Sequence, residues 1–171
     1  MSNFETVEMP QPLGLFAGEL LARGSEYLTA LKTLEAQEKG STYVSYFLFA
    51  HTLELFFKSF LAAKGVSKKD LRKKLGHCLP SLFSLSEEHG IPVVAALSEF
   101  SAHTYEMNRD YDFRYPSGYK LSMPRLADCI RVAEQLELAI RPIVEPVAAR
   151  ANLQFASDTR HLRGKKIRWS D

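Results

Sequence analysis

Apolar residues recur at intervals of three and four along most of the chain, a pattern typical of helices with one buried face. The first such stretch begins near Leu15 and ends before Gly40. A second runs from Tyr43 to Lys64, stops at Gly65 and is apolar on most of its circumference. This breadth predicts a central helix that is covered on several sides.

Three further helices are predicted after a basic turn or short helix at residues 67–75. One opens at residues 77–80 and runs to about Glu88; Pro80 fits there because the first helical turn needs no amide donor. Another spans 93–107, and a long one starts at 122–124 and ends near Pro142 or Pro146. Short connections favour antiparallel neighbours. The sequence predicts an all-α fold, an antiparallel up-and-down helical bundle of four to five helices, and no strand pair.

The chain divides into an irregular N-terminal arm at 1–14, the bundle at 15–149 and a basic C-terminal tail at 150–171, expected to be extended or weakly helical. Its 171 residues suit one domain. It has no apolar run long enough to cross a bilayer and no secretory signal at its start. Cys78 and Cys129 lie in apolar helical contexts, which indicates buried reduced thiols. These features favour a cytoplasmic protein without a membrane segment.

Positive charge is concentrated in two places, although the whole chain carries only +2. Residues 150–171 hold six cations and two anions, and residues 68–74 hold five cations and one anion, so each segment carries +4. Such clusters attract phosphate-bearing partners, or they form solvated faces.

Three polar residues interrupt the central apolar helix. His51, Glu54 and Lys58 follow one another at spacings of three and four, so they lie on one helix face. Charges that are partly buried need a partner. The trio predicts either a polar pocket, with Arg109 or Arg114 as a further partner, or a buried ion network that sets the packing register.

Two later segments add candidate chemistry. His77, at the start of the third helix, suits contact with a phosphate or general acid–base work, or it caps that helix. The loop after the fourth helix combines rings that stack on bases with guanidinium groups that bind phosphate, or it docks on the bundle. No His or Cys pair has metal-site spacing and no phosphate-binding glycine loop occurs, so neither metal nor cofactor is expected. The aromatic and cationic candidates in this region are Tyr105, Arg109, Tyr111, Arg114 and Tyr115.

The order of these motifs resembles one known family. The sequence gives His51-x-x-Glu54-x-x-x-Lys58, Gly76-His77-x-Leu79, Tyr105-x-x-x-Arg109 and Arg114-Tyr115-Pro116. Over residues 43–141 this order resembles the HEPN (higher eukaryotes and prokaryotes nucleotide-binding) family, in which a Leu-Glu-x-x-x-Lys helix leads into a Gly-His-x-Leu start. The resemblance implies a compact antiparallel bundle that is commonly dimeric, so a homodimer is expected.

The resemblance also implies two kinds of function. HEPN proteins cut RNA without a metal, or they partner a small nucleotidyltransferase, often as toxin–antitoxin pairs. RNA-cutting members carry an Arg followed by His after four to six residues, a spacing that Arg72 and His77 have. The first expectation is a bundle that binds nucleotide or RNA beside a nucleotidyltransferase. The alternatives are a metal-independent endoribonuclease, using His77 with Arg72 or Arg114, and a non-enzymatic interaction bundle.

Overall fold

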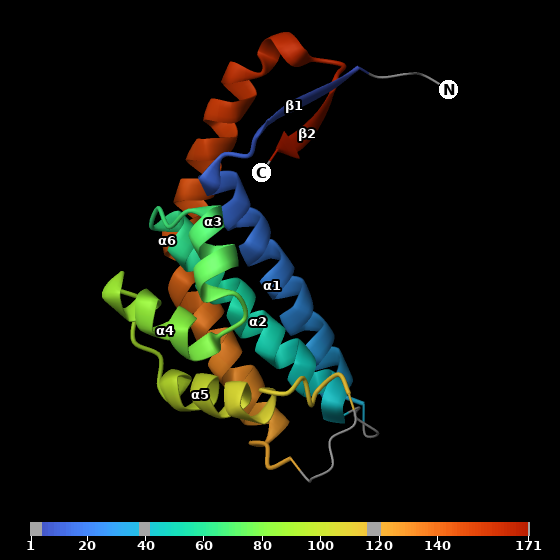
Figure 1. Ribbon diagram of the computed structural model, residues 1–171, viewed down its shortest axis with the longest axis vertical. Helices are drawn as coiled ribbons and strands as arrows, with labels where there is room; N and C mark the ends of the chain where they lie inside the picture. The colour runs from blue at the N-terminus through green and yellow to red at the C-terminus, as the bar shows by residue number, and fades with distance from the viewer. Residues whose placement is uncertain (1–4, 38–41, 116–120, 171) are drawn as a thin grey trace.

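A computed structural model describes residues 5–37, 42–115 and 121–170, which are mostly helical (Figure 1). The expected fold class is therefore confirmed at this level. These ranges contain six α-helices, so the expected four to five is not exact. Gly40 and Pro116, used in the sequence predictions, lie outside them. The elements are β1 Thr6–Pro10, α1 Leu13–Glu35, α2 Thr42–Ala63, α3 Lys68–Asp70, a π-helical turn Leu71–Leu75, α4 Leu79–Glu88, α5 Leu97–Met107, α6 Leu126–Asp158, a 3-10 turn Arg160–Leu162 and β2 Lys166–Ser170.

The core forms where α2 meets α1 and α6, with α4 and α5 packed against its other side. In Figure 1, α1 runs in the opposite direction to both α2 and α6. The α2 side chains Phe49, Leu53, Phe56, Phe57 and Phe60 have no exposed surface. Burying each of them stabilises the fold by roughly 1.5–3 kcal/mol relative to an exposed position. The prediction that this helix is covered on several sides is confirmed.

Helix α6 continues through both prolines at which the sequence analysis ended it, so that prediction was wrong. A proline leaves the carbonyl four residues earlier without its amide partner. For Pro142 that carbonyl belongs to Leu138, which is largely exposed and accessible to water, and for Pro146 it belongs to Pro142 itself. Ile140 and Val144 are fully buried on either side of Pro142. Their packing keeps the helix continuous across the missing hydrogen bonds.

The predicted irregular arm contains β1, which pairs in parallel with β2 from the predicted tail. The Lys166 amide donates to the Glu5 carbonyl oxygen at 3.0 Å. The expectation of no strand pair was therefore wrong. Each strand has only five residues, and its partner lies at the far end of the sequence, so local periodicity carries little signal. Residues 150–158 of the tail are helical, because they belong to α6.

Helices α4 and α5 form a side layer against α2 (Figure 1). Helix α4 begins at Leu79, close to the predicted start, with Cys78 at its N-cap. Helix α5 begins at Leu97, four residues after the predicted start at Val93. The preceding Ala96 has a φ of 62°, a left-handed conformation that no α-helix can contain. This layer brings the start of α4 and the end of α5 to the same face of α2.

Both cysteines are free thiols, as predicted, although only Cys129 is buried. Burial, reinforced by the nearby Asp128 carboxylate, raises the pKa of the Cys129 thiol to about 12, so this thiol stays protonated. Cys78 is half-exposed at the start of α4. Among the described helices, none combines the length and the hydrophobicity that a membrane crossing needs.

One close approach fixes how α1 sits on α2. A Cβ atom added at Gly24 would lie 2.5 Å from the Cε1 atom of the Phe56 ring. Gly24 and Phe56 are both buried, so neither can move into solvent. Glycine at this position therefore allows the aromatic core to reach the α1 backbone.

We expect Gly24→Ala to destabilise the protein, because the added methyl group collides with Phe56. Overpacking costs roughly 1–3 kcal/mol, which exceeds the gain of about 1 kcal/mol from replacing a helical glycine. Urea denaturation of wild type, Gly24→Ala, Phe56→Leu and the double variant measures the coupling. In the Phe56→Leu background the alanine should cost less. A stabilising Gly24→Ala in the wild-type background would contradict this account.

Candidate functional site

The Glu54 carboxylate lies at the centre of a cluster of basic side chains. Glu54 Oε1 accepts a hydrogen bond from Lys58 Nζ at 2.6 Å, one turn later on α2. His77 Nδ1, from the turn before α4, lies 3.0 and 2.9 Å from the two carboxylate oxygens. His51 Nδ1 lies 3.8 Å from Oε2, which is an electrostatic contact rather than a hydrogen bond. The cluster therefore joins α2 to the start of α4.

This environment determines the charge of Glu54. Only 9% of the side chain is exposed, and burial by itself raises the pKa of a carboxyl group. The basic groups of His51, Lys58 and His77 outweigh burial and lower the pKa of Glu54 to about 2, from an ordinary value of 4.5. Glu54 is thus ionised at neutral pH, and Lys58, itself 13% exposed, balances its charge.

Aromatic rings hold His51 in place beside this carboxylate. Its imidazole is parallel to the Phe47 ring, with centroids 6.0 Å apart, and meets the edge of Tyr27 at 4.7 Å. Phe47 also lies under the Arg114 guanidinium, at 5.0 Å, and Tyr111 lies 5.7 Å from the same group. Arg114 therefore contacts two aromatic faces, which favours its planar cation.

The loop that carries Arg114 is held by local contacts. The Phe113 amide donates to Asn108 Oδ1 at 3.2 Å, and the Arg114 amide donates to the Tyr111 carbonyl at 2.8 Å. Tyr111 has a φ of 63°, a strained left-handed conformation for a bulky residue. Asp112 is buried, so its carboxylate does not face the solvent. These contacts direct Arg114 back towards α2.

A cavity of about 280 Å³ opens above the Glu54 cluster. This volume lies just below the range for small-molecule sites, roughly 300–1,000 Å³, so it suits part of a nucleotide rather than a structured RNA. The cavity contains seven of the ten residues proposed from sequence. These are His51, Glu54, His77, Tyr105, Arg109, Tyr111 and Arg114.

The N-terminus of α4 opens onto the same cavity, which Cys78 and Leu79 line. No side chain caps this ten-residue helix. Its first amides and the positive end of its dipole favour an anion. On the opposite wall, the Thr104 hydroxyl is buried and has no hydrogen-bond partner among the described residues. A hydrogen bond with Cys78 raises the pKa of Tyr105, so α4 and α5 also meet here.

Three of the proposed residues do not line the cavity. Lys58 lies behind Glu54 and acts on the site only through that carboxylate. Tyr115 is 67% exposed on the loop surface. Arg72 lies in the exposed π-helical turn, so the structure does not place the predicted Arg72–His77 pair in one cavity. The spacing of that pair in sequence does not translate into proximity at the site.

The cavity is also lined by residues that the sequence analysis did not select, among them Phe47, Thr104 and Asn108. Phe47 lies four residues before His51, and this helical spacing would have identified it. Thr104 and Asn108 are also four residues apart and flank Tyr105 and Arg109. Within the described ranges, no group of three or more His, Cys, Asp or Glu side chains is arranged to hold a metal ion.

No family model, curated protein or solved structure matches this chain. The interpretation of the cavity therefore rests on its own residues, and the HEPN resemblance stays an expectation from sequence.

The lowered pKa of Glu54 predicts a specific loss of stability in acid. A carboxylate whose pKa is lower in the folded state contributes stability above its unfolded pKa, and this contribution disappears as pH falls from about 4.5 to 2. The shift corresponds to on the order of 3 kcal/mol. Glu54→Gln should lower the free energy of unfolding at pH 7 and reduce its dependence on pH between about 4.5 and 2. Chemical denaturation at several pH values measures both effects.

Glu134→Gln is the matched control, because Glu134 pairs with Lys32 on the exposed surface. This variant should keep the wild-type dependence of stability on pH in that range. Equal slopes for wild type and Glu54→Gln between pH 4.5 and 2 would show that the Glu54 pKa is not lowered.

Proposed function

We propose that the cavity binds a phosphate-bearing ligand, either a nucleotide or an unpaired nucleotide of RNA. The observation that carries this proposal is that Arg109, Arg114, His77 and the uncapped α4 N-terminus meet around one cavity. Guanidinium groups and helix N-termini are both standard phosphate ligands.

The charge balance of the site supports an anionic ligand. Glu54 is the carboxylate that lines the cavity, and Lys58 neutralises it from behind. Arg109 lies 3.3 Å from Glu106, but both side chains are more than half exposed, so water competes with this pair. Arg114 contacts rings rather than a carboxylate in the interactions described above. The arginines are therefore available to a ligand's phosphate.

The aromatic residues of the cavity supply surfaces for a base. Phe47, Tyr105 and Tyr111 all line it, and Tyr111 is more than half exposed. A base that stacks on an aromatic side chain gains roughly 1–3 kcal/mol. Thr104 adds a hydroxyl whose hydrogen bond a ligand can complete. Phosphate contacts from the arginines together with stacking favour a nucleotide over inorganic phosphate.

The HEPN resemblance supports the same ligand class and extends it to partners. On that basis we propose that the bundle works beside a small nucleotidyltransferase, as in toxin–antitoxin pairs, and that it forms a homodimer in the cytoplasm. We also propose that the helices form an antiparallel up-and-down bundle. The antiparallel course of α1 against α2 and α6 supports it (Figure 1).

We expect Arg114→Gln to weaken binding of a fluorescent mononucleotide about tenfold or more, because a charge-assisted contact contributes roughly 1.5–3 kcal/mol. Fluorescence anisotropy at several salt concentrations measures both the affinity and its salt dependence. Arg131→Gln is the matched control, since Arg131 is exposed, pairs with Asp128 and does not line the cavity. Binding that is absent in wild type, or equal in the two variants, would rule out the proposal.

A metal-independent endoribonuclease is the second candidate, favoured by the contact between Glu54 and His77. Because the carboxylate holds Nδ1, the ring is oriented with Nε2 on its opposite side. An imidazole oriented in this way can accept a proton from a ribose 2′-hydroxyl while Arg114 stabilises the charge on the phosphate. His77 is 73% exposed, which leaves it accessible to RNA.

If this second function is present, the protein should cleave single-stranded RNA in EDTA, as followed on denaturing gels. His77→Ala and Glu54→Gln should each lower the rate by about 10²-fold or more, the usual range for general acid–base groups. Arg72→Ala should have little effect, because Arg72 lies outside the cavity. Cleavage that depends on Arg72 but not on Glu54 would refute this arrangement. If the protein neither binds nucleotide nor cleaves RNA, the remaining hypothesis is the non-enzymatic interaction bundle.

A further inference from the structure

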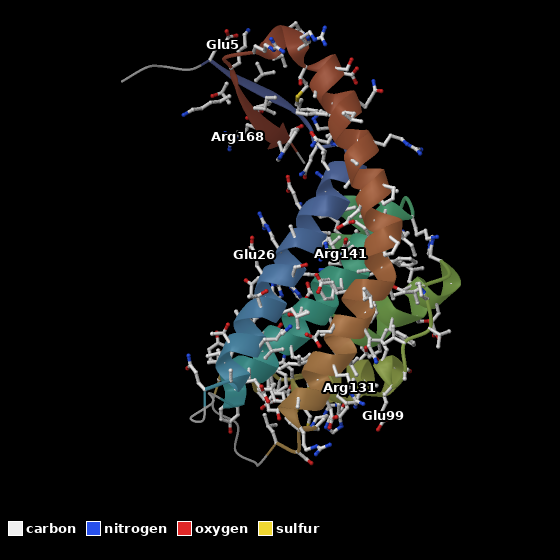
Figure 2. The ribbon with its side chains drawn as sticks, turned by 180° about the vertical axis from the view of Figure 1, so that it is seen from behind. Glu5, Glu26, Glu99, Arg131, Arg141 and Arg168 are labelled. Atoms are coloured by element: carbon white, nitrogen blue, oxygen red, sulfur yellow. The ribbon has the colours of Figure 1, made fainter. Side chains whose placement is uncertain are left out.

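The paired strands β1 and β2 lie at one end of the molecule, beyond the helical bundle (Figure 1). Figure 2 shows Arg168 on β2 and Glu5 just before β1, at the opposite end from Arg131. The ring of Trp169 meets Phe155 of α6 edge to face, with centroids 5.2 Å apart. A two-stranded sheet is marginally stable by itself and usually needs a third strand or a covering helix. The lobe formed by β1 and β2 therefore has sheet edges at which another strand can pair.

The two outer edges of this sheet differ. The Lys166 amide points to β1, so by alternation the backbone groups of Ile167 and Trp169 point outward from β2. By the same alternation Pro10 is one of the outward positions of β1, and it has no amide to donate. The edge of β2 contains no proline. Its backbone can therefore both donate to and accept from an incoming strand.

The charges on β2 indicate what kind of strand it pairs with. β1 already provides an example, because its Glu8 lies 3.5 Å from Arg168. Just before the two strands, Glu5 lies 3.0 Å from Lys165. Arg168 keeps 72% of its side chain exposed in this pair, so a carboxylate on the other side can also reach it. Opposite charges on adjacent strands stabilise pairing by roughly 0.2–1 kcal/mol each.

We propose that the outer edge of β2 binds an extended segment of a partner protein, in which acidic residues alternate with apolar ones. Alternation follows from the pleat, since Lys166 and Arg168 share one face of β2 while Ile167 and Trp169 share the other. Acidic side chains would lie beside the two cations, and apolar side chains beside Ile167 and Trp169. The main chain supplies the hydrogen bonds, as in other cases of strand addition.

A second copy of this chain fits the edge less well. Symmetric antiparallel pairing of two β2 strands brings Lys166 and Arg168 of both copies together, and like charges on adjacent strands are unfavourable. Pairing through β1 would use the edge that Pro10 interrupts. Charge complementarity therefore selects an acidic partner segment.

Trp169 is the only tryptophan of the chain, so its fluorescence reports directly on this edge. We would titrate the full-length protein with a short peptide of alternating glutamate and valine. The expected result is saturable binding with a change in Trp169 emission. The same peptide with a central proline, and a peptide of alternating lysine and valine, should each bind about tenfold more weakly or not at all.

Two proline variants test the edge itself. Ile167→Pro removes an outward amide of β2 and should weaken peptide binding about tenfold, whereas Thr6→Pro removes an outward amide of β1 and should not. Arg168→Gln, which keeps the backbone intact, should weaken binding and reduce its salt dependence. It thus provides a test even if Ile167→Pro disrupts the lobe.

Three results would overturn the proposal. The first is no binding of the glutamate–valine peptide, or equal binding of its proline-containing version. The second is self-association in analytical ultracentrifugation that Ile167→Pro abolishes, which would make a second copy the occupant. The third is displacement of the peptide by single-stranded RNA with the same change in Trp169 emission, which would indicate a general polyanion surface.

Discussion

The arrangement of the site depends on one buried carboxylate. Glu54 lies on the most apolar helix of the protein, where an ionised group is tolerated only with partners. Lys58 comes from the same helix, but His77 comes from the turn before α4, so satisfying Glu54 fixes where α4 begins. That position in turn places Cys78 and Leu79, at the start of α4, in the lining of the cavity. A buried charge thus specifies geometry here, in addition to any contribution to stability.

The sequence predicted the helices of the core well, because their apolar residues repeat over many turns and their packing agrees with the local pattern. The candidates that it listed on α2, at the Gly76-His77 turn, and on α5 and the loop after it include seven residues that line one cavity. The continuation of α6 through Pro142 was missed because tertiary packing outweighed a local helix-breaking signal. The Arg72–His77 spacing did not locate both residues at the site, because Arg72 lies in an exposed π-helical turn and does not line the cavity.

The remaining differences between prediction and structure depend on contacts between segments that are far apart in sequence, which no local pattern records. The pairing of β1 with β2 needs α6 to reach past the bundle, and no five-residue segment encodes that reach. Asp112 shows the same limit for the site, because sequence alone gives its charge but not its burial. The aromatic stack from Tyr27 through His51 and Phe47 to Arg114 likewise joins three separate segments. Most of the polar and aromatic residues of the cavity could be predicted from sequence, whereas the way in which they surround it could not.

The parallel ladder between β1 and β2 also sets an order of assembly. Residues of α1 and α2 follow each other closely in the chain and can meet with little loss of loop entropy, whereas the two strands lie at opposite ends of the described residues. Because the two strands meet where α6 extends beside α1, we expect the ladder to form after the helices have packed and to open before them. Such a segment exchanges its amide hydrogens as a unit separate from the bundle. The lobe can therefore come apart and re-form while the cavity stays intact.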